Sequence, residues 1–300
     1  MQSLTVRILS SRPLVYTDRV DADEDRPPHV RAASAIAARG DELFVVQDDA
    51  GFIARVCGDS VTSIALPRGR DGRRRFEAAI GNKLEKLDLE SCVIIDDELW
   101  AFGSGTIPIR EHVVRMPFDG TPRITHEAAL YAALRDAVGG AINIEGVALV
   151  GDELWFFHRG NTSAHDRPAI VRVDRHRARR GARCDRSWKV CAIDRFDLGR
   201  ASGTSIGFTD ACSFGDHRIV FIAAAEASAN AIDDGAVLAS VIGVLDRGEI
   251  RTAPLDLEGK KPEGIAMRDA NHAWITVDPD DPDMPTTLHE VAVYGINSSK

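Results

Sequence analysis

Five oxygen-bearing residues recur at similar intervals along the chain, and each one opens an apolar segment. They are Ser34, Glu90, Glu145, Asp210 and Glu263, separated by 56, 55, 65 and 53 residues. Hard oxygen ligands in a group that contains no His or Cys are those that calcium and magnesium bind, in contrast to zinc. If the fold brings these residues together, the sequence predicts a site for a divalent cation.

The segments that begin at these residues share one pattern. Each has an apolar strand, a short polar turn and a second apolar strand, which begins nine residues after the opening residue. The ninth positions hold Leu43, Leu99, Leu154 and Ile219, and the fifth copy has one extra turn residue before Ala273. A repeat of this length accommodates a four-stranded blade with its connections. The sequence therefore predicts an all-β, five-bladed β-propeller, in which the first strand of each blade lies nearest the axis and the opening residues meet at one mouth of the central channel.

The remaining strands fit the same architecture. Pairs of apolar segments flank turn residues at 58–59, 119–120 and 246–248. The fifth repeat has only three strands, whereas the N-terminal segment SLTVRILSS has no repeat of its own. We predict that this N-terminal strand completes the fifth blade and closes the ring, which protects two strand edges. Residues 127–140 have apolar side chains at helical spacing and predict one short helix between the second and third blades. Residues 1–300 are expected to form a single domain.

Charge repulsion at the predicted mouth indicates that something must balance the carboxylates. Anions roughly 7 Å apart, at an effective dielectric constant near 20, repel by ~2 kcal/mol per pair. Four carboxylates make six pairs, and the total rivals the stability of a whole domain. Either some carboxylates are protonated or a cation lies among them. We expect Ca²⁺ in preference to Mg²⁺, because the flexible calcium shell accepts six to eight oxygens around an axis.

The pattern of opening residues resembles that of a known family. Soluble calcium-activated nucleotidases (apyrases) are five-bladed propellers whose central calcium is held by a serine, two glutamates, a serine and a glutamate. Ser34, Glu90, Glu145, Asp210 and Glu263 match these positions in order, with Asp210 replacing the second serine. The resemblance implies calcium at these five residues and hydrolysis of nucleoside phosphates. From end to end, the chain is still more similar to an uncharacterised bacterial propeller family with a domain of unknown function, which implies the fold alone.

Basic residues are expected around the metal mouth. Loops that follow second strands, and loops that connect blades, should lie on the same face as the opening residues. The candidate contacts for a substrate on this face are Arg75, Lys83, Lys86 and Arg159, together with Asp48 and Asp278. A metal surrounded by Arg and Lys suits a small anionic, phosphorylated ligand, because both stabilise negative charge. His158 is the candidate general base and Arg159 the candidate catalytic cation, although strand alternation points them to opposite sides.

Three functions are consistent with these features. The first is a calcium-dependent hydrolase that acts on an anionic small molecule. The second is a metal-dependent lactonase or esterase, because sugar-lactone-hydrolysing propellers also use a glutamate that opens a strand in a sequence similar to Pro262-Glu263-Gly264. The third is a non-catalytic binding scaffold in which the central calcium is structural, since a propeller fold alone gives no evidence of catalysis.

Composition sets the remaining expectations. The chain is 44% hydrophobic and 28% charged, as in a soluble globular protein, and its net charge of −9 argues against a nucleic-acid partner. No apolar stretch approaches the ~20 residues that cross a bilayer, and the N-terminus has no signal-like apolar region, so we expect no membrane partner and a cytoplasmic location. The five cysteines have no zinc-type spacing and are expected to be reduced. No oligomeric state is indicated.

Overall fold

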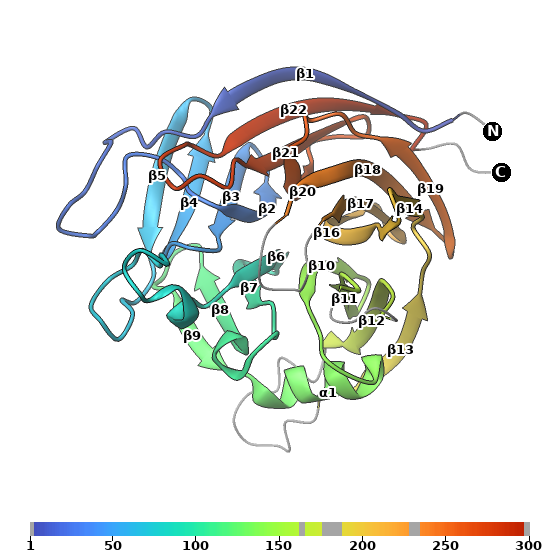
Figure 1. Cartoon of the computed structure of the whole chain (residues 1–300), viewed down its shortest axis with the longest axis horizontal. Coiled ribbons are helices and arrows are strands. Elements are labelled where there is room, and N and C mark those ends of the chain that lie inside the picture. Colours follow the sequence, from blue (N-terminus) through green and yellow to red (C-terminus); the bar gives the residue numbers. More distant parts are fainter. Residues whose placement is uncertain (1–2, 162–165, 176–187, 228–234, 297–300) are drawn as a thin grey trace.

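The computed structural model describes residues 3–161, 166–175, 188–227 and 235–296. Within these residues, five four-stranded antiparallel sheets are arranged as blades around a central axis (Figure 1). The predicted five-bladed β-propeller is therefore confirmed. Among the described helices, none is both long enough and apolar enough to cross a membrane.

Each blade runs from an inner strand near the axis to an outer strand. The first blade contains β2 (Ala33–Arg39), β3 (Glu42–Gln47), β4 (Phe52–Cys57) and β5 (Ser60–Ala65). The second contains β6 (Leu89–Ile95), β7 (Glu98–Gly103), β8 (His112–Pro117) and β9 (Arg123–His126). The third contains β10 (Ile144–Val150), β11 (Glu153–His158), β12 (Ala169–Asp174) and β13 (Val190–Arg195). A small hairpin, β14 (Arg200–Ala201) and β15 (Thr204–Ser205), leads to the fourth.

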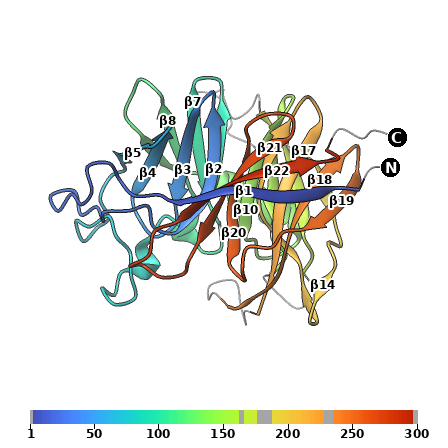
Figure 2. The same cartoon turned by 90° about the horizontal axis from the view of Figure 1, so that it is seen from above.

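The last two blades complete the ring. The fourth contains β16 (Gly207–Phe214), β17 (Arg218–Glu226), β18 (Val237–Asp246) and β19 (Glu249–Pro254). The fifth contains β20 (Lys261–Met267), β21 (His272–Asp278) and β22 (Thr287–Tyr294), and its outer strand is β1 (Thr5–Pro13), which pairs antiparallel with β22. Figure 2 shows β1 lying along β22. One blade thus contains strands from both ends of the chain.

Hydrophobic side chains fill the spaces between neighbouring blades. Five buried clusters are found in the described residues, one at each interface between adjacent blades. At the interface of the second and third blades, the rings of Phe102 and Phe156 meet edge to face at 5.2 Å. The inner strands also pack against one another in the closed order β2, β6, β10, β16, β20 and back to β2. This closed contact fixes the distance of every inner strand from the axis.

The predicted helix is present as α1 (Ala128–Val138). Its buried face, with Leu130, Tyr131 and Leu134, joins the hydrophobic cluster between the second and third blades. The Tyr131 hydroxyl donates a hydrogen bond to the Gly103 carbonyl oxygen at 2.9 Å. Two short 3-10 turns are present, η1 (Lys83–Glu85) between the first and second blades and η2 (Pro108–Arg110) between β7 and β8. The connection that contains η1 is the basic segment between the first and second blades.

Gly243 in the fourth blade lies directly against the ring of Phe221 on the neighbouring strand. A Cβ atom at Gly243 would lie 2.1 to 2.6 Å from three ring atoms of Phe221, which is completely buried. We predict that Gly243→Ala lowers the free energy of unfolding by about 1 to 3 kcal/mol, because the ring has no room to move. Gly140→Ala is the control, since no atom lies within 4 Å of its Cβ position. Urea unfolding should separate the two variants, and equal stability would contradict the packing.

Candidate metal-binding site

Each inner strand contains a β-bulge near its first residue. A bulge leaves one residue without a partner on the neighbouring strand and redirects its side chain. The five residues in this position are Ser34 in β2, Glu90 in β6, Glu145 in β10, Thr209 in β16 and Glu263 in β20. Because the inner strands surround the axis, the bulges place these side chains around one mouth of the channel. We call these five residues the bulge ring.

The fourth member of the bulge ring is Thr209, where the sequence predicted Asp210. In the first three blades, the turn between the inner strand and the second strand has two residues, as between Arg39 and Glu42. In the fourth blade Phe214 pairs with Arg218, so this turn has three residues. Counting nine residues back from Ile219 therefore ends one residue too late. The bulge ring carries two hydroxyls and three carboxylates.

Asp210 lies one residue further along β16 and has a different environment. Its side chain is only 1% exposed, and its Oδ2 accepts a hydrogen bond from the Ile265 backbone N–H at 2.8 Å. Burial raises the pKa of Asp210 well above its usual value, although backbone N–H groups of Ile265, Ala211 and Ile36 act in the opposite direction. Asp210 therefore links the inner strands of the fourth, fifth and first blades.

Cationic side chains balance part of the bulge ring. Glu145 accepts hydrogen bonds from Asn143 Nδ2 at 2.7 Å and from Arg159 Nη1 at 3.1 Å. Lys261 Nζ lies 2.9 Å from a Glu263 oxygen. Buried cations of the protein itself therefore balance part of the repulsion, in addition to the protons or the bound cation expected from the sequence. Lys261 lies two residues before Glu263 in β20, whereas Arg159 reaches Glu145 from the segment that follows β11.

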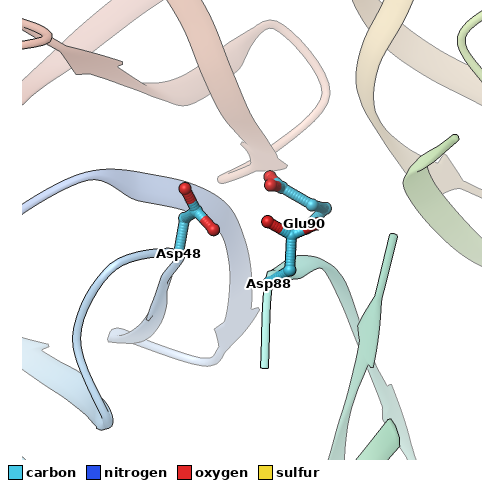
Figure 3. A group of neighbouring side chains, drawn as sticks. All are labelled: Asp48, Asp88 and Glu90. Atoms are coloured by element: carbon cyan, nitrogen blue, oxygen red, sulfur yellow. The ribbon is translucent and has the colours of Figure 1, made fainter. Parts of the chain in front are cut away.

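Glu90 is the ring carboxylate that lacks such a partner. Among the described residues, no hydrogen bond or ion pair reaches its carboxylate, and its oxygens instead face two aspartates. One ligand oxygen from each of Asp48, Asp88 and Glu90 lies within 4.8 Å of the others (Figure 3). Asp48 follows β3, whereas Asp88 immediately precedes β6, and we call these three residues the acidic cluster. The sequence analysis named Asp48 as a substrate contact and missed Asp88, which lies two residues before a ring residue.

The electrostatics of the acidic cluster are uneven. Asp88 lies 2.8 Å from Lys86 Nζ and 2.9 Å from Arg110 Nη1; burial raises its pKa, but these cations lower it below its usual value. Burial raises the pKa of Asp48 to about 7 despite its contact with Lys86. Burial, with the charges of Asp48, Asp88 and Glu145, raises the pKa of Glu90 well above its usual value. Negative charge is thus least compensated at Glu90.

The donor atoms fit a hard divalent cation. All three cluster side chains supply carboxylate oxygens, and the buried Oδ1 atom of Asp48 has no hydrogen-bond partner. In the same mouth, the buried Thr209 Oγ1 also has no partner, although Thr209 is only 1% exposed. Buried polar atoms without partners are uncommon in folded proteins and require an explanation. Carboxylate and hydroxyl oxygens are ligands of calcium and magnesium, so a bound cation of this type would explain these unpartnered atoms.

Both predicted catalytic residues are buried and make contacts with other side chains. His158 is completely buried; its Nδ1 accepts a hydrogen bond from the Asn143 N–H at 3.0 Å, and its Nε2 lies 2.8 Å from an Asp166 oxygen. With both ring nitrogens engaged, His158 does not face the mouth as a general base. Arg159 pairs with Glu145 and Glu226 and is 7% exposed, so its guanidinium already has anionic partners.

A pocket of about 290 Å³ lies beside the acidic cluster and contains most of the predicted substrate contacts. Asp48, Lys83, Lys86 and Asp278 are among its lining residues, whereas Arg75 and Arg159 are not. Arg75 instead bonds Asp25 through Nε and Nη2 at 3.1 and 3.0 Å. Other arginines of the same connection are also paired, as Arg74 is with Glu24. Acidic residues in the segment before β2, such as Glu24 and Asp25, therefore neutralise much of the positive charge of this connection. The net charge of either segment alone does not indicate this pairing.

Substitutions at the two neighbouring positions of β16 should have opposite consequences. We predict that Thr209→Val changes the free energy of unfolding by less than about 0.5 kcal/mol in the presence of chelator, because it removes a hydroxyl that bonds nothing. Asp210→Ala should cost about 2 kcal/mol or more, since it leaves the Ile265 N–H unpaired and creates a cavity. Chemical unfolding in EDTA measures both. Equal losses would contradict the assignment of Thr209 to the ring.

The pH dependence of stability follows from the raised pKa values. Asp48 titrates at about 7 and Asp278 at about 8 in the folded protein, above the value of about 3.9 for an unfolded chain. Between these values the folded state binds more protons than the unfolded state, so stability falls as pH rises. In EDTA, we predict a higher free energy of unfolding near pH 6 than near pH 8.5. Asp278→Asn should flatten the profile, and an unchanged slope would contradict this explanation.

Comparisons with known proteins agree with the fold. A hypothetical protein from Leishmania major has a TM-score of 0.52 at 13% identity, with 97% of this chain and 93% of that chain covered. A Myxococcus xanthus glutaminyl cyclase gives 0.48 at 10% identity, with 96% of each chain covered. A GH43 endo-arabinanase from Bacillus licheniformis gives 0.46 at 10% identity, with coverage of 87% and 93%. At 13% identity, the similarity to the Leishmania major protein concerns the fold alone.

Sequence comparison identifies the family. No curated protein matches the chain. The model of a family of unknown function, DUF6929, matches residues 29–293, which include all five inner strands and the whole acidic cluster. This five-bladed β-propeller therefore belongs to the family of unknown function DUF6929.

Proposed function

We propose that this protein is a calcium-binding β-propeller whose ion binds at the acidic cluster. The observation that carries this proposal is the position of Glu90, a carboxylate that makes no ion pair among the described residues and faces Asp48 and Asp88 within 4.8 Å. Three carboxylates at such distances repel strongly in a partly desolvated mouth. Lys86 contacts Asp48 and Asp88 but makes no ion pair with Glu90. A divalent cation would supply the missing positive charge.

Calcium fits this arrangement better than magnesium. The cluster is built from two segments, with Asp48 after β3 and with Asp88 and Glu90 at the start of β6. Calcium accepts six to eight oxygens in variable geometry, whereas magnesium requires near-ideal octahedral coordination. Glu90 also belongs to the bulge ring, so we assign it as the ligand shared between the two groups. The ring members that would extend the calcium shell toward the axis are Ser34, Glu145, Thr209 and Glu263.

We propose that the bound ion takes part in the hydrolysis of a small molecule in the adjoining pocket. Asp48 and Lys86 belong to both the pocket wall and the surroundings of the acidic cluster, so a ligand in the pocket would lie next to the metal. Calcium in that position would polarise an oxygen of the ligand. The resemblance to calcium-activated nucleotidases supports this reaction class, and Thr209 supplies a hydroxyl at the fourth ring position, as that family pattern has.

A structural role for the calcium is the second candidate. Buried ion pairs already connect blades at this mouth, since Glu226 of the fourth blade contacts Arg159 of the third and lies 3.8 Å from Lys261 of the fifth. Asp48 and Asp88 likewise come from the segments of the first and second blades. A cation bound between them would add a link of the same kind and would stabilise the ring without any reaction.

Calcium binding can be tested with one charge-removing variant and a matched control. We predict that calcium raises the melting temperature of the protein and that Glu90→Gln weakens calcium binding by about 10-fold or more, because it removes the shared ligand. In EDTA the same variant should be at least as stable as the parent. Asp97→Asn is the control, since it removes one charge at an exposed turn at the other end of β6. Isothermal titration calorimetry with CaCl₂ measures affinity, and unchanged affinity in Glu90→Gln would refute the site.

Turnover assays separate the two candidate functions. Nucleoside di- and triphosphates, simple phosphoesters, lactones and carboxylic esters are each incubated with protein in calcium, magnesium or EDTA. Calcium-dependent turnover that is lost in Glu90→Gln supports a hydrolase. Calcium-dependent stability without turnover of any substrate supports the structural role.

A further inference from the structure

The pocket beside the acidic cluster has an excess of negative charge. It lies among the segments that follow β3 and β21 and the connection that contains η1. Six carboxylates and three cationic side chains line it. The carboxylates are Asp48, Asp49, Glu77, Asp278, Asp280 and Asp281, and the cations are Arg31, Lys83 and Lys86. An anionic ligand would therefore meet more repulsion than attraction, unless the cations are free to contact it.

Two of the three cations are already neutralised. Arg31 is 3% exposed and pairs with Asp49 and, at 2.6 Å, with Glu77. Lys86 is 6% exposed and lies between Asp48 and Asp88. Each of these buried cations thus contacts two carboxylates, so neither is available to a phosphate without losing an existing partner. Lys83 remains as the lining cation that has no ion pair in the described part of the chain.

Asp278 is the lining carboxylate with the least compensation. It makes no ion pair within the described residues, and the charged groups that act on it are Asp280, Asp49 and Asp48, all negative. Asp49 adds a buried Oδ1 atom without a hydrogen-bond partner. These two acceptors come from different blades, since Asp49 follows β3 and Asp278 ends β21. Asp278 Oδ1 accepts a hydrogen bond of 3.3 Å from the Asp280 N–H, but its carboxylate has no cationic partner among the described residues. Asp278 and Asp49 therefore remain able to accept hydrogen bonds from a ligand in this pocket.

Calcium at the acidic cluster does not remove this excess. With Asp88, Glu90 and Arg110 added, the pocket and the cluster together hold eight carboxylates and four cationic side chains, so the two charges of calcium would leave a formal charge of −2. Asp278 lies outside the cluster and is not a ligand of the proposed ion. The charge of the pocket is therefore a property separate from the occupancy of the metal site.

We propose that this pocket binds an organic cation, a small primary amine or guanidinium compound, with Asp278 as its ion-pair partner. An ammonium group offers three donors and no acceptor, and it can therefore satisfy Asp278 together with Asp49. The volume of about 290 Å³ suits a small molecule and not a polymer. The inference goes beyond calcium binding and replaces the phosphorylated ligand expected from the sequence with an aminated one.

Calorimetry with three probes of different charge tests this inference. Putrescine is the cation, 1,4-butanediol is its uncharged analogue of similar length, and inorganic pyrophosphate is the anion. With calcium-loaded protein at about pH 8.5, where Asp278 is mostly ionised, and about 0.15 M NaCl, we expect putrescine to bind about 10-fold or more tightly than either comparator, since charge-assisted hydrogen bonds to Asp278 are made only by the diamine. Asp278→Asn should lower putrescine affinity by about 10-fold. Lys83→Gln should leave it equal or increase it.

These experiments test the proposed metal site and the proposed pocket ligand separately. Putrescine binding that persists in Glu90→Gln supports the pocket even if calcium binding is absent. Putrescine that displaces calcium, with affinity unaffected by Asp278→Asn, would show that the amine binds the acidic cluster and would overturn the proposal. Tighter binding of pyrophosphate than of putrescine, or no binding of putrescine and of the longer amine spermidine, would also overturn it.

Discussion

Repulsion among carboxylates at one end of the propeller axis is the constraint on which the site depends. Five inner strands pack against one another in a closed ring, and their bulges direct two hydroxyls and three carboxylates to the same mouth. In a partly desolvated space these charges must be balanced. The protein balances Glu145 with Arg159 and Glu263 with Lys261, but it leaves Glu90 to face two aspartates. Because two of the three ring carboxylates have a cationic partner and Glu90 does not, negative charge is concentrated on the Glu90 side of the ring.

Close packing of the inner strands explains why glycine follows two of the ring residues, Glu145 and Glu263. A Cβ atom at Gly264 would lie 2.9 Å from the Ile36 backbone nitrogen, and one at Gly146 would lie 3.0 Å from the Ala211 nitrogen. Close approach of the inner strands therefore requires glycine at these positions. Gly207 serves the mouth in another way, because a Cβ there would lie 2.7 Å from Arg159 Cγ. Removing one methyl group lets the Arg159 side chain cross to Glu226 and connect the third and fourth blades.

The repeat made most of the fold predictable, because a period in hydrophobicity is carried by many residues at once. The inner strands followed from it. The helix expected over 127–140, present over 128–138, followed instead from apolar residues at helical spacing. The position of Thr209 in the bulge ring was not predicted. The turn between Phe214 and Arg218 has one additional residue, so a count of nine residues back from Ile219 ends at Asp210. Asp88 and the pairing of Arg75 with Asp25 were also missed. They depend on contacts between separate segments, for which a single sequence carries no periodic signal.

The pairing of β1 with β22 has a consequence for the way in which the ring opens. The other four blades are each formed by one continuous stretch of chain, whereas the fifth is held together by hydrogen bonds between the two ends. Detachment of β1 is thus a route to unfolding that breaks no other blade. The pocket lies at the junction of the fifth and first blades, directly after that closure point along the ring. A ligand that bridges Asp49 and Asp278 would fasten the two sides of this junction and slow the opening of the propeller, which couples occupancy of the pocket to the lifetime of the folded state.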